Sequence, residues 1–294
     1  MLFRSFPEKS KFRVKARVSN SLSGWFKGRL KDPQVEILPI DAKNNAIVVS
    51  GEPVVVPTFL HIKNRIEMSS KENQWRQNNG GTWNITNATS YQSDIFEYLE
   101  HFRPLVSDRA AGVNTFWSLN STSWGNDSPC LVDKKRVLGV VSTNAMAYDG
   151  SSPKYEGGTL NYRVAGMHYM PDGATLVEGT YDLLMRSDAA RCLYGFSNAP
   201  VQATISITGE QSQKVAVTSM TESNGWIKLS AYGFNFSTPT IKVKLTQEKK
   251  SAPVVKPAPK KTITCVKGKT TRKISGASPK CPIGFKKKIG RAHV

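Results

Sequence analysis

The stretch TIKVKLT at residues 240–246 alternates apolar with polar side chains over its whole length. This period of two places Ile241, Val243 and Leu245 on one face of a β-strand, and the lysines and threonines on the other. We expect one face to pack on a core and the other to meet water. The exposed lysines also favour an edge strand, because charged side chains hinder pairing with a neighbouring chain.

Working outward, other short β-rich runs precede this stretch. Gly, Asp and Asn turns such as Asp149-Gly150 and Asn224-Gly225 separate them. Regular short strands with such turns are typical of an antiparallel sandwich. The fold class expected is mainly β, with Ig-like antiparallel β-sandwiches: an N-terminal β-rich module at 6–129 and a sandwich module at 130–247. The predicted strands are 11–18, 34–40, 46–50, 113–119, 137–142, 159–165, 180–186, 203–208, 215–220, 226–231 and 240–246.

One short helix is predicted near residues 94–103, in the N-terminal half. Its apolar residues fall at helical spacing: Ile95, Tyr98, Leu99 and Phe102. Ser93 is suited to cap its first turn, and the residue after Arg103 is a proline, which ends a helix.

The formal net charge of the 294 residues is +19, but it is unevenly placed. Residues 1–31 carry nine basic and one acidic residue, and 248–294 carry fourteen and one, so 32–247 has a net charge of −2. The basic tail holds only Phe285 as a base-stacking aromatic, which disfavours nucleic acid as a partner. No uncharged apolar run approaches the roughly 18 residues of a membrane-spanning helix.

Composition changes at Glu248. Residues 248–261 contain three prolines and several lysines, which predicts an extended Pro/Lys linker. Residues 262–288 form a small basic module. We expect its cationic side chains to contact anionic cell-wall polymer or lipid headgroups; the alternative is a tail that only aids solubility. The residues proposed for this contact are Lys267, Lys269, Arg272, Lys273, Lys280, Lys286, Lys287 and Lys288.

The four cysteines suggest two disulfides. Cys265 and Cys281 bracket fifteen residues of a module with few apolar residues. A disulfide bond there would supply stability that the small hydrophobic core cannot. Cys130 and Cys192 remain as a second pair, although four cysteines allow three connectivities. The alternative is four free thiols in a cytoplasmic protein; a zinc site is disfavoured because no two cysteines have its spacing. Disulfides would place the protein outside the cytoplasm.

No motif points to catalysis. H-E-x-x-H, G-x-S-x-G, P-loop and G-x-G-x-x-G patterns do not occur. His168, between Met167 and Tyr169, is expected to be packed or hydrogen-bonded. We therefore expect a non-enzymatic protein with no metal and no cofactor.

Tryptophans in the polar region 75–128 support an alternative function. Trp83 and Trp124, with Trp75 and Trp117, could stack on sugar rings, as in a carbohydrate-binding module of a larger secreted hydrolase whose catalytic part is missing. Packing of these side chains in the core is the favoured interpretation. Glycans or surface proteins are the corresponding partners of the body.

Both ends resemble translated sequencing adapters. Residues 2–5 correspond to CTC TTC CGA TCT, and 289–294 to ATC GGA AGA GCA CAC GTC. Residues 1–5 and 289–294 are therefore interpreted as artefacts, with the natural start and any signal peptide upstream of Phe6. The alternative is an ordinary basic N-terminus and an unrelated tail.

Several segments resemble secreted or cell-surface β-rich proteins of planktonic actinobacteria. GTYDLLMRSD at 179–188, ARCLYGF at 190–196 and NGWI at 224–227 are similar to a module of these proteins. ITCVKGK at 263–269 and PKCPIGFKKK at 279–288 resemble their short C-terminal module and are the more specific match. The likeness covers residues 130–288 and is less clear before Cys130. It implies export, a β-rich body and a C-terminal position, and it carries over no activity.

Overall fold

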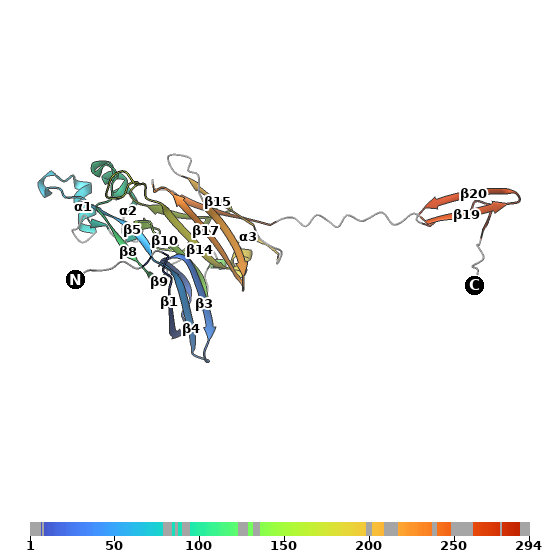
Figure 1. Ribbon diagram of the computed structural model, residues 1–294, viewed down its shortest axis with the longest axis horizontal. Helices are drawn as coiled ribbons and strands as arrows, with labels where there is room; N and C mark the ends of the chain where they lie inside the picture. Colours follow the sequence, from blue (N-terminus) through green and yellow to red (C-terminus); the bar gives the residue numbers. More distant parts are fainter. Residues whose placement is uncertain are drawn as a thin grey trace. The chain divides into compact units, whose positions relative to one another are not determined.

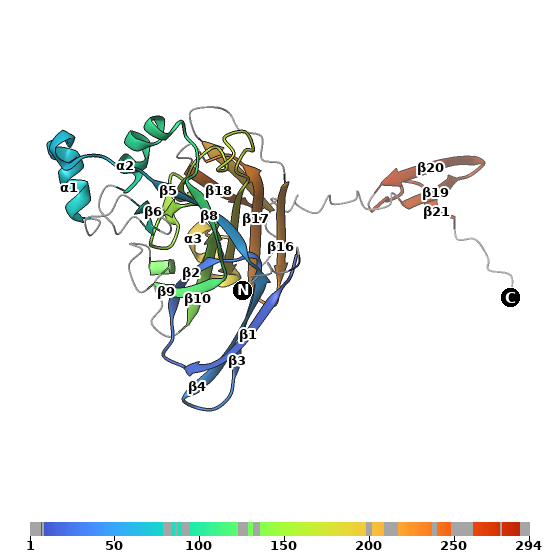
Figure 2. The same ribbon diagram turned by 60° about the vertical axis from the view of Figure 1, so that its left-hand side comes forward.

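The chain divides into two compact units, Met1–Glu248 and Lys249–Val294. The computed structural model (Figures 1 and 2) describes residues 7, 9–78, 84–85, 88–89, 95–122, 129–131, 136–197, 202–208, 217–236, 240–247, 261–276 and 278–288. The expected boundary at 129/130 falls inside the first unit, because strands from both sides of it share one sheet. Residues 1–6, 289–294 and most of the linker lie outside the described residues.

The first unit is mainly β, as expected. Its first six-stranded sheet is antiparallel except for the parallel pair β10 and β2. In order across the sheet, the strands are β16 (Val217–Ser223), β17 (Trp226–Phe234), β14 (Gly179–Arg186), β10 (Val137–Thr143), β2 (Gly24–Arg29) and β9 (Ser118–Thr122).

A second sheet contains the stretch at 240–246. Its order is β15 (Gln202–Thr208), β18 (Thr240–Thr246), β13 (Thr159–Ala165), β11 (Ala147–Tyr148) and β7 (Ala88–Thr89), with β12 (Lys154–Glu156) paired to β13. In β18 the apolar residues are buried and Lys244 is exposed, which confirms the alternation. The edge-strand prediction is wrong, because β18 pairs with β15 on one side and β13 on the other. The lysines of β18 therefore lie on the solvent-facing side of a central strand and do not protect a sheet edge.

One core joins the two sheets. Tyr181 and Leu229 of the first sheet pack with Tyr162 and Val243 of the second, and all four are fully buried or nearly so. The sheets therefore form two layers around a shared apolar interior.

The described residues form three α-helices, where one was expected. They are α1 (Ser70–Asn78), α2 (Ile95–Phe102) and α3 (Ser187–Tyr194), with 3₁₀ turns η1 (Arg65–Glu67), η2 (Pro104–Val106) and η3 (Pro129–Leu131). The predicted helix is confirmed as α2, whose four expected apolar residues are all buried. Its proposed cap, Ser93, lies outside the described residues. No helix among the described residues is long and apolar enough to cross a membrane.

The described part of the first unit also contains two three-stranded sheets. One has the order β1 (Phe12–Ser19), β4 (Asn44–Glu52), β3 (Lys31–Pro39), and projects from the sandwich in Figure 1. Its residues Val35 and Val49 pack with Phe26, Val140 and Leu184 of the first six-stranded sheet. The other sheet has β5 (Val54–Leu60) between β6 (Asn84–Ile85) and β8 (Gly112–Phe116), so the strand predicted at 113–119 is divided between β8 and β9.

The second unit is a small antiparallel sheet. β19 (Lys261–Lys267) lies between β20 (Thr270–Gly276) and β21 (Lys286–Lys287). Within this sheet the side chain of Cys265 is fully buried.

Candidate functional site

Both predicted disulfides are present. Cys130 of η3 is bonded to Cys192 of α3, and Cys265 of β19 is bonded to Cys281 near β21, with Cα atoms 5.6 and 5.7 Å apart. The zinc and free-thiol alternatives are excluded for these four cysteines. Two disulfides indicate folding in an oxidising environment.

We call residues 261–288 the basic tail unit. Its sequence contains nine basic residues and no Asp or Glu. All eight basic residues proposed for surface contact are exposed: Lys267, Lys269, Arg272, Lys273, Lys280, Lys286, Lys287 and Lys288. This unit therefore presents charge of one sign only.

Strand register distributes that charge over both faces of the small sheet. Arg272 and Lys287 stand opposite Cys265, whereas Lys273 and Lys286 stand opposite its two neighbours in β19. Residues directly opposite each other share a face, and neighbours along a strand do not. Each face thus carries at least two cations.

An apolar side chain accompanies these cations. Ile283 is fully exposed in the turn that Phe285 closes by donating its backbone N–H to the carbonyl of Pro282, 3.0 Å away. The guanidinium of Arg272 lies 5.5 Å from the centre of the Phe285 ring. The turn therefore places one exposed aliphatic group three residues before the first of three consecutive lysines.

The tryptophans proposed for sugar stacking divide into two groups. Trp75 is buried, and its ring centre lies 5.7 Å from that of Tyr98. Trp117 is half-buried and donates from Nε1 to the carbonyl oxygen of Gly51 at 3.0 Å. These two have structural roles, while Trp83 and Trp124 lie outside the described residues, and their stacking role stays a prediction.

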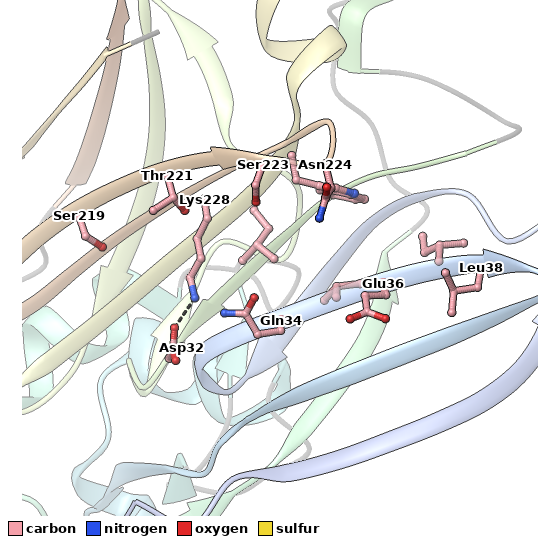
Figure 3. Close-up of a pocket in the computed structure, with 13 residues that line it drawn as sticks. Asp32, Gln34, Glu36, Leu38, Ser219, Thr221, Ser223, Asn224 and Lys228 are labelled. Carbon is pink, nitrogen blue, oxygen red and sulfur yellow. Dashed lines mark hydrogen bonds and ion pairs between the residues drawn. The ribbon is translucent and has the colours of Figure 1, made fainter. Parts of the chain in front are cut away.

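The sequence did not predict a groove in the first unit, between β3 and the β16–β17 hairpin (Figure 3). Its volume is about 660 Å³, within the usual range for ligand sites. It exists because the β1–β4–β3 sheet covers only part of the outer face of the first six-stranded sheet. The lining residues are Asp32, residues 34–38, Leu184, Ser219, Thr221, residues 223–224, Trp226 and Lys228.

Charged residues define one end of the groove. Lys228 forms an ion pair with Asp32, drawn as a dashed line in Figure 3, and Lys11 approaches the other Asp32 oxygen at 2.5 Å. Burial opposes ionisation of Asp32, but the hydrogen bonds from the two lysines outweigh it and hold its pKa below the usual range. Two ammonium groups therefore share one carboxylate at this end.

A buried carboxyl group lies beside this pair. Asp182 of β14 is fully buried and accepts hydrogen bonds from Ser230 Oγ at 2.5 Å and from the backbone N–H of Asp32 at 3.3 Å. Burial raises its pKa to about 6, in spite of these donors. The group helps to fix Asp32 in place.

Comparison with known proteins associates neither the groove nor the basic tail unit with a family: no family model, no curated protein and no solved structure matches the chain significantly.

Proposed function

We propose that this chain is a non-enzymatic, secreted protein of the cell surface, in an adhesive or structural role. Its Ig-like body is held at the cell by the basic tail unit, which binds anionic polymer of the wall or anionic lipid headgroups. The resemblance to exported actinobacterial proteins favours the same location. The single observation that carries the proposal is a disulfide-closed unit with nine basic and no acidic residues.

Physical chemistry supports a surface rather than a single ligand as the partner. The cations lie on both faces of the small sheet instead of converging on one point. Such a distribution suits an extended array of phosphate groups, and its attraction depends on ionic strength because exposed charges are screened. Anionic wall polymer and anionic lipid headgroups both present phosphate groups. They differ because only the headgroups lie on an apolar layer.

The test is co-sedimentation of the full chain with two materials, at low and at high salt. One material is vesicles of phosphatidylcholine with or without phosphatidylglycerol, and the other is purified wall with or without its anionic polymer. A tail variant changes Lys267, Lys286, Lys287 and Lys288 to Gln. A matched control changes four exposed lysines of the body to Gln: Lys15, Lys43, Lys154 and Lys244.

We expect the tail variant to lose at least tenfold in affinity and the control to bind as the wild type does. The anionic material with which the wild-type protein sediments identifies whether the phosphate groups belong to lipid or to wall polymer. Equal binding by the tail variant, or binding that ignores salt, would contradict the proposal.

A further inference from the structure

The outer edge of β3 is open along the groove. β3 is the last strand of the β1–β4–β3 sheet, and among the described residues no strand pairs with its other side. In an antiparallel pair, alternate residues direct their backbone groups away from the partner. Two or three of residues 34–38 therefore direct N–H and C=O groups away from β4. Pro33 and Pro39 limit this open edge at both ends.

The groove lining shows that this edge, rather than a sheet face, forms one wall. All five residues of 34–38 line the groove, although successive side chains of a strand point to opposite faces. From β16 and β17, in contrast, only every second residue lines it: Ser219, Thr221, Ser223, Trp226 and Lys228. Figure 3 shows these two sets on opposite sides of the groove. The groove therefore lies between the edge of β3 and the face of the sheet that contains β16 and β17.

We propose that the groove binds an extended segment of a partner polypeptide, which pairs with β3 as a fourth strand. Addition of a peptide strand to an open sheet edge is a common mode of peptide recognition, in which main-chain hydrogen bonds give affinity and side-chain pockets give specificity. A single strand is the shape that the site accepts, since a folded sheet brought to this edge would meet the β16–β17 hairpin.

The lining specifies the chemistry of the segment. Alternate side chains of the bound strand face Leu184 and the half-buried Trp226, which suits apolar residues. Glu36 is more than half exposed, with Arg13 only at 4.0 Å, and suits a basic residue across the new strand pair. The ion pair of Asp32 and Lys228 sets the end of the strand. The expected ligand is an extended segment of alternating apolar residues with one basic residue.

A neutral oligosaccharide is the main competing ligand. Trp226 and the hydroxyl groups of Ser219, Thr221 and Ser223 suit sugars as well as peptides. A sugar, however, has no ladder of alternating donors and acceptors to pair with β3. The open strand edge therefore favours a peptide.

The test begins with selection of peptides from a random dodecapeptide phage library on the full chain. A Thr221→Arg variant, which fills the groove from its β16 wall, serves for counter-selection. Thr115→Arg, at an exposed threonine of strand β8, is the matched control. We expect synthetic versions of the enriched peptides to bind wild type and Thr115→Arg equally, and Thr221→Arg at least tenfold more weakly. Hydrogen exchange at residues 34–38 should slow on binding.

Three outcomes overturn the proposal, provided that circular dichroism shows Thr221→Arg to be folded. The first is no enrichment on wild type over Thr221→Arg. The second is peptide binding that leaves exchange at residues 34–38 unchanged. The third is binding of cellohexaose or chitohexaose that Trp226→Ala abolishes, which would make the groove a carbohydrate site.

Discussion

Tyr232 donates a hydrogen bond of 2.7 Å from its hydroxyl to Oδ1 of Asp182, at the centre of the first six-stranded sheet. Ser230 donates to the same oxygen, because it stands directly opposite Asp182 in the register of β14 and β17. Even so, burial dominates and raises the pKa of Asp182 to about 6. The native state thus binds this proton more tightly than the unfolded chain does.

Stability should therefore depend on pH through Asp182. For a carboxyl group with a raised pKa, the stabilisation is complete below the unfolded value near 4 and is lost as pH rises through about 6. Relative to Asp182→Asn, we expect the wild type to lose about 2 kcal/mol of unfolding free energy between pH 4 and 7. Urea unfolding at four pH values measures this. A constant difference between the two proteins would contradict it, and Glu156→Gln, an exposed carboxyl, is the control.

The second prediction concerns the contact of Gly139 with Trp25. A Cβ atom on Gly139 would lie 2.2 Å from the Trp25 ring, which is far closer than any real contact. Gly139→Ala should lower the unfolding free energy by about 2 to 3 kcal/mol, because overpacking in a close-packed core is costly. In Trp25→Leu, the same alanine should cost much less. Gly112→Ala, where the nearest atom is at an ordinary 3.4 Å, is the control. If Gly139→Ala lowered the unfolding free energy equally in the wild type and in Trp25→Leu, overlap with the Trp25 ring would not be the cause.

The sequence predicted correctly which side chains of a single strand or helix are buried. The alternation in β18 and the helical spacing in α2 identified their buried residues, because each follows from side-chain direction within one element. Whether β18 is central or at an edge depends on β15 and β13, which are distant in sequence. The edge prediction was wrong for that reason.

The groove could not be predicted in the same way. Its edge comes from residues 34–38 and its opposite wall from residues 219–228, and no local pattern records that these segments meet. The start of α1, in contrast, could have been predicted from the sequence, because Ser69 and Glu72 have the spacing of a capping box. The two cysteine pairings were predictable because one pair lies inside a module too small to have much core.

The capping box supports a third prediction. Glu72 accepts from the backbone N–H of Ser69 at 2.7 Å, while its own N–H donates to Ser69 Oγ at 3.2 Å. Burial opposes ionisation of Glu72, but hydrogen bonds from Lys63 and Ser69 outweigh it and lower the pKa to about 2. This stabilisation is present above the unfolded pKa and is lost as pH falls towards 2.

Glu72→Gln should lower the unfolding free energy by about 2 kcal/mol at pH 7, and by progressively less as pH falls below 4. Chemical denaturation over this pH range measures the effect. Glu67→Gln, at an exposed position of η1, should have little effect at any pH. A cost for Glu72→Gln that persists at pH 2 would show that the ionised carboxylate is not its source.

The last prediction concerns the disulfide of the basic tail unit. Apart from Cys265, its apolar side chains are half-buried, such as Ile263 and Ile274, or exposed, such as Ile283, so burial contributes little to its stability. Closing a loop of this length stabilises by about 3 kcal/mol in the chain-entropy model. In full-length Cys265→Ser/Cys281→Ser, backbone amides of β19 and β20 should therefore lose their protection from hydrogen exchange, while those of β10 keep theirs. Cys130→Ser/Cys192→Ser is the matched control and should leave the basic tail unit protected. Unchanged exchange in β19 after loss of Cys265 and Cys281 would show that strand pairing alone holds this unit together.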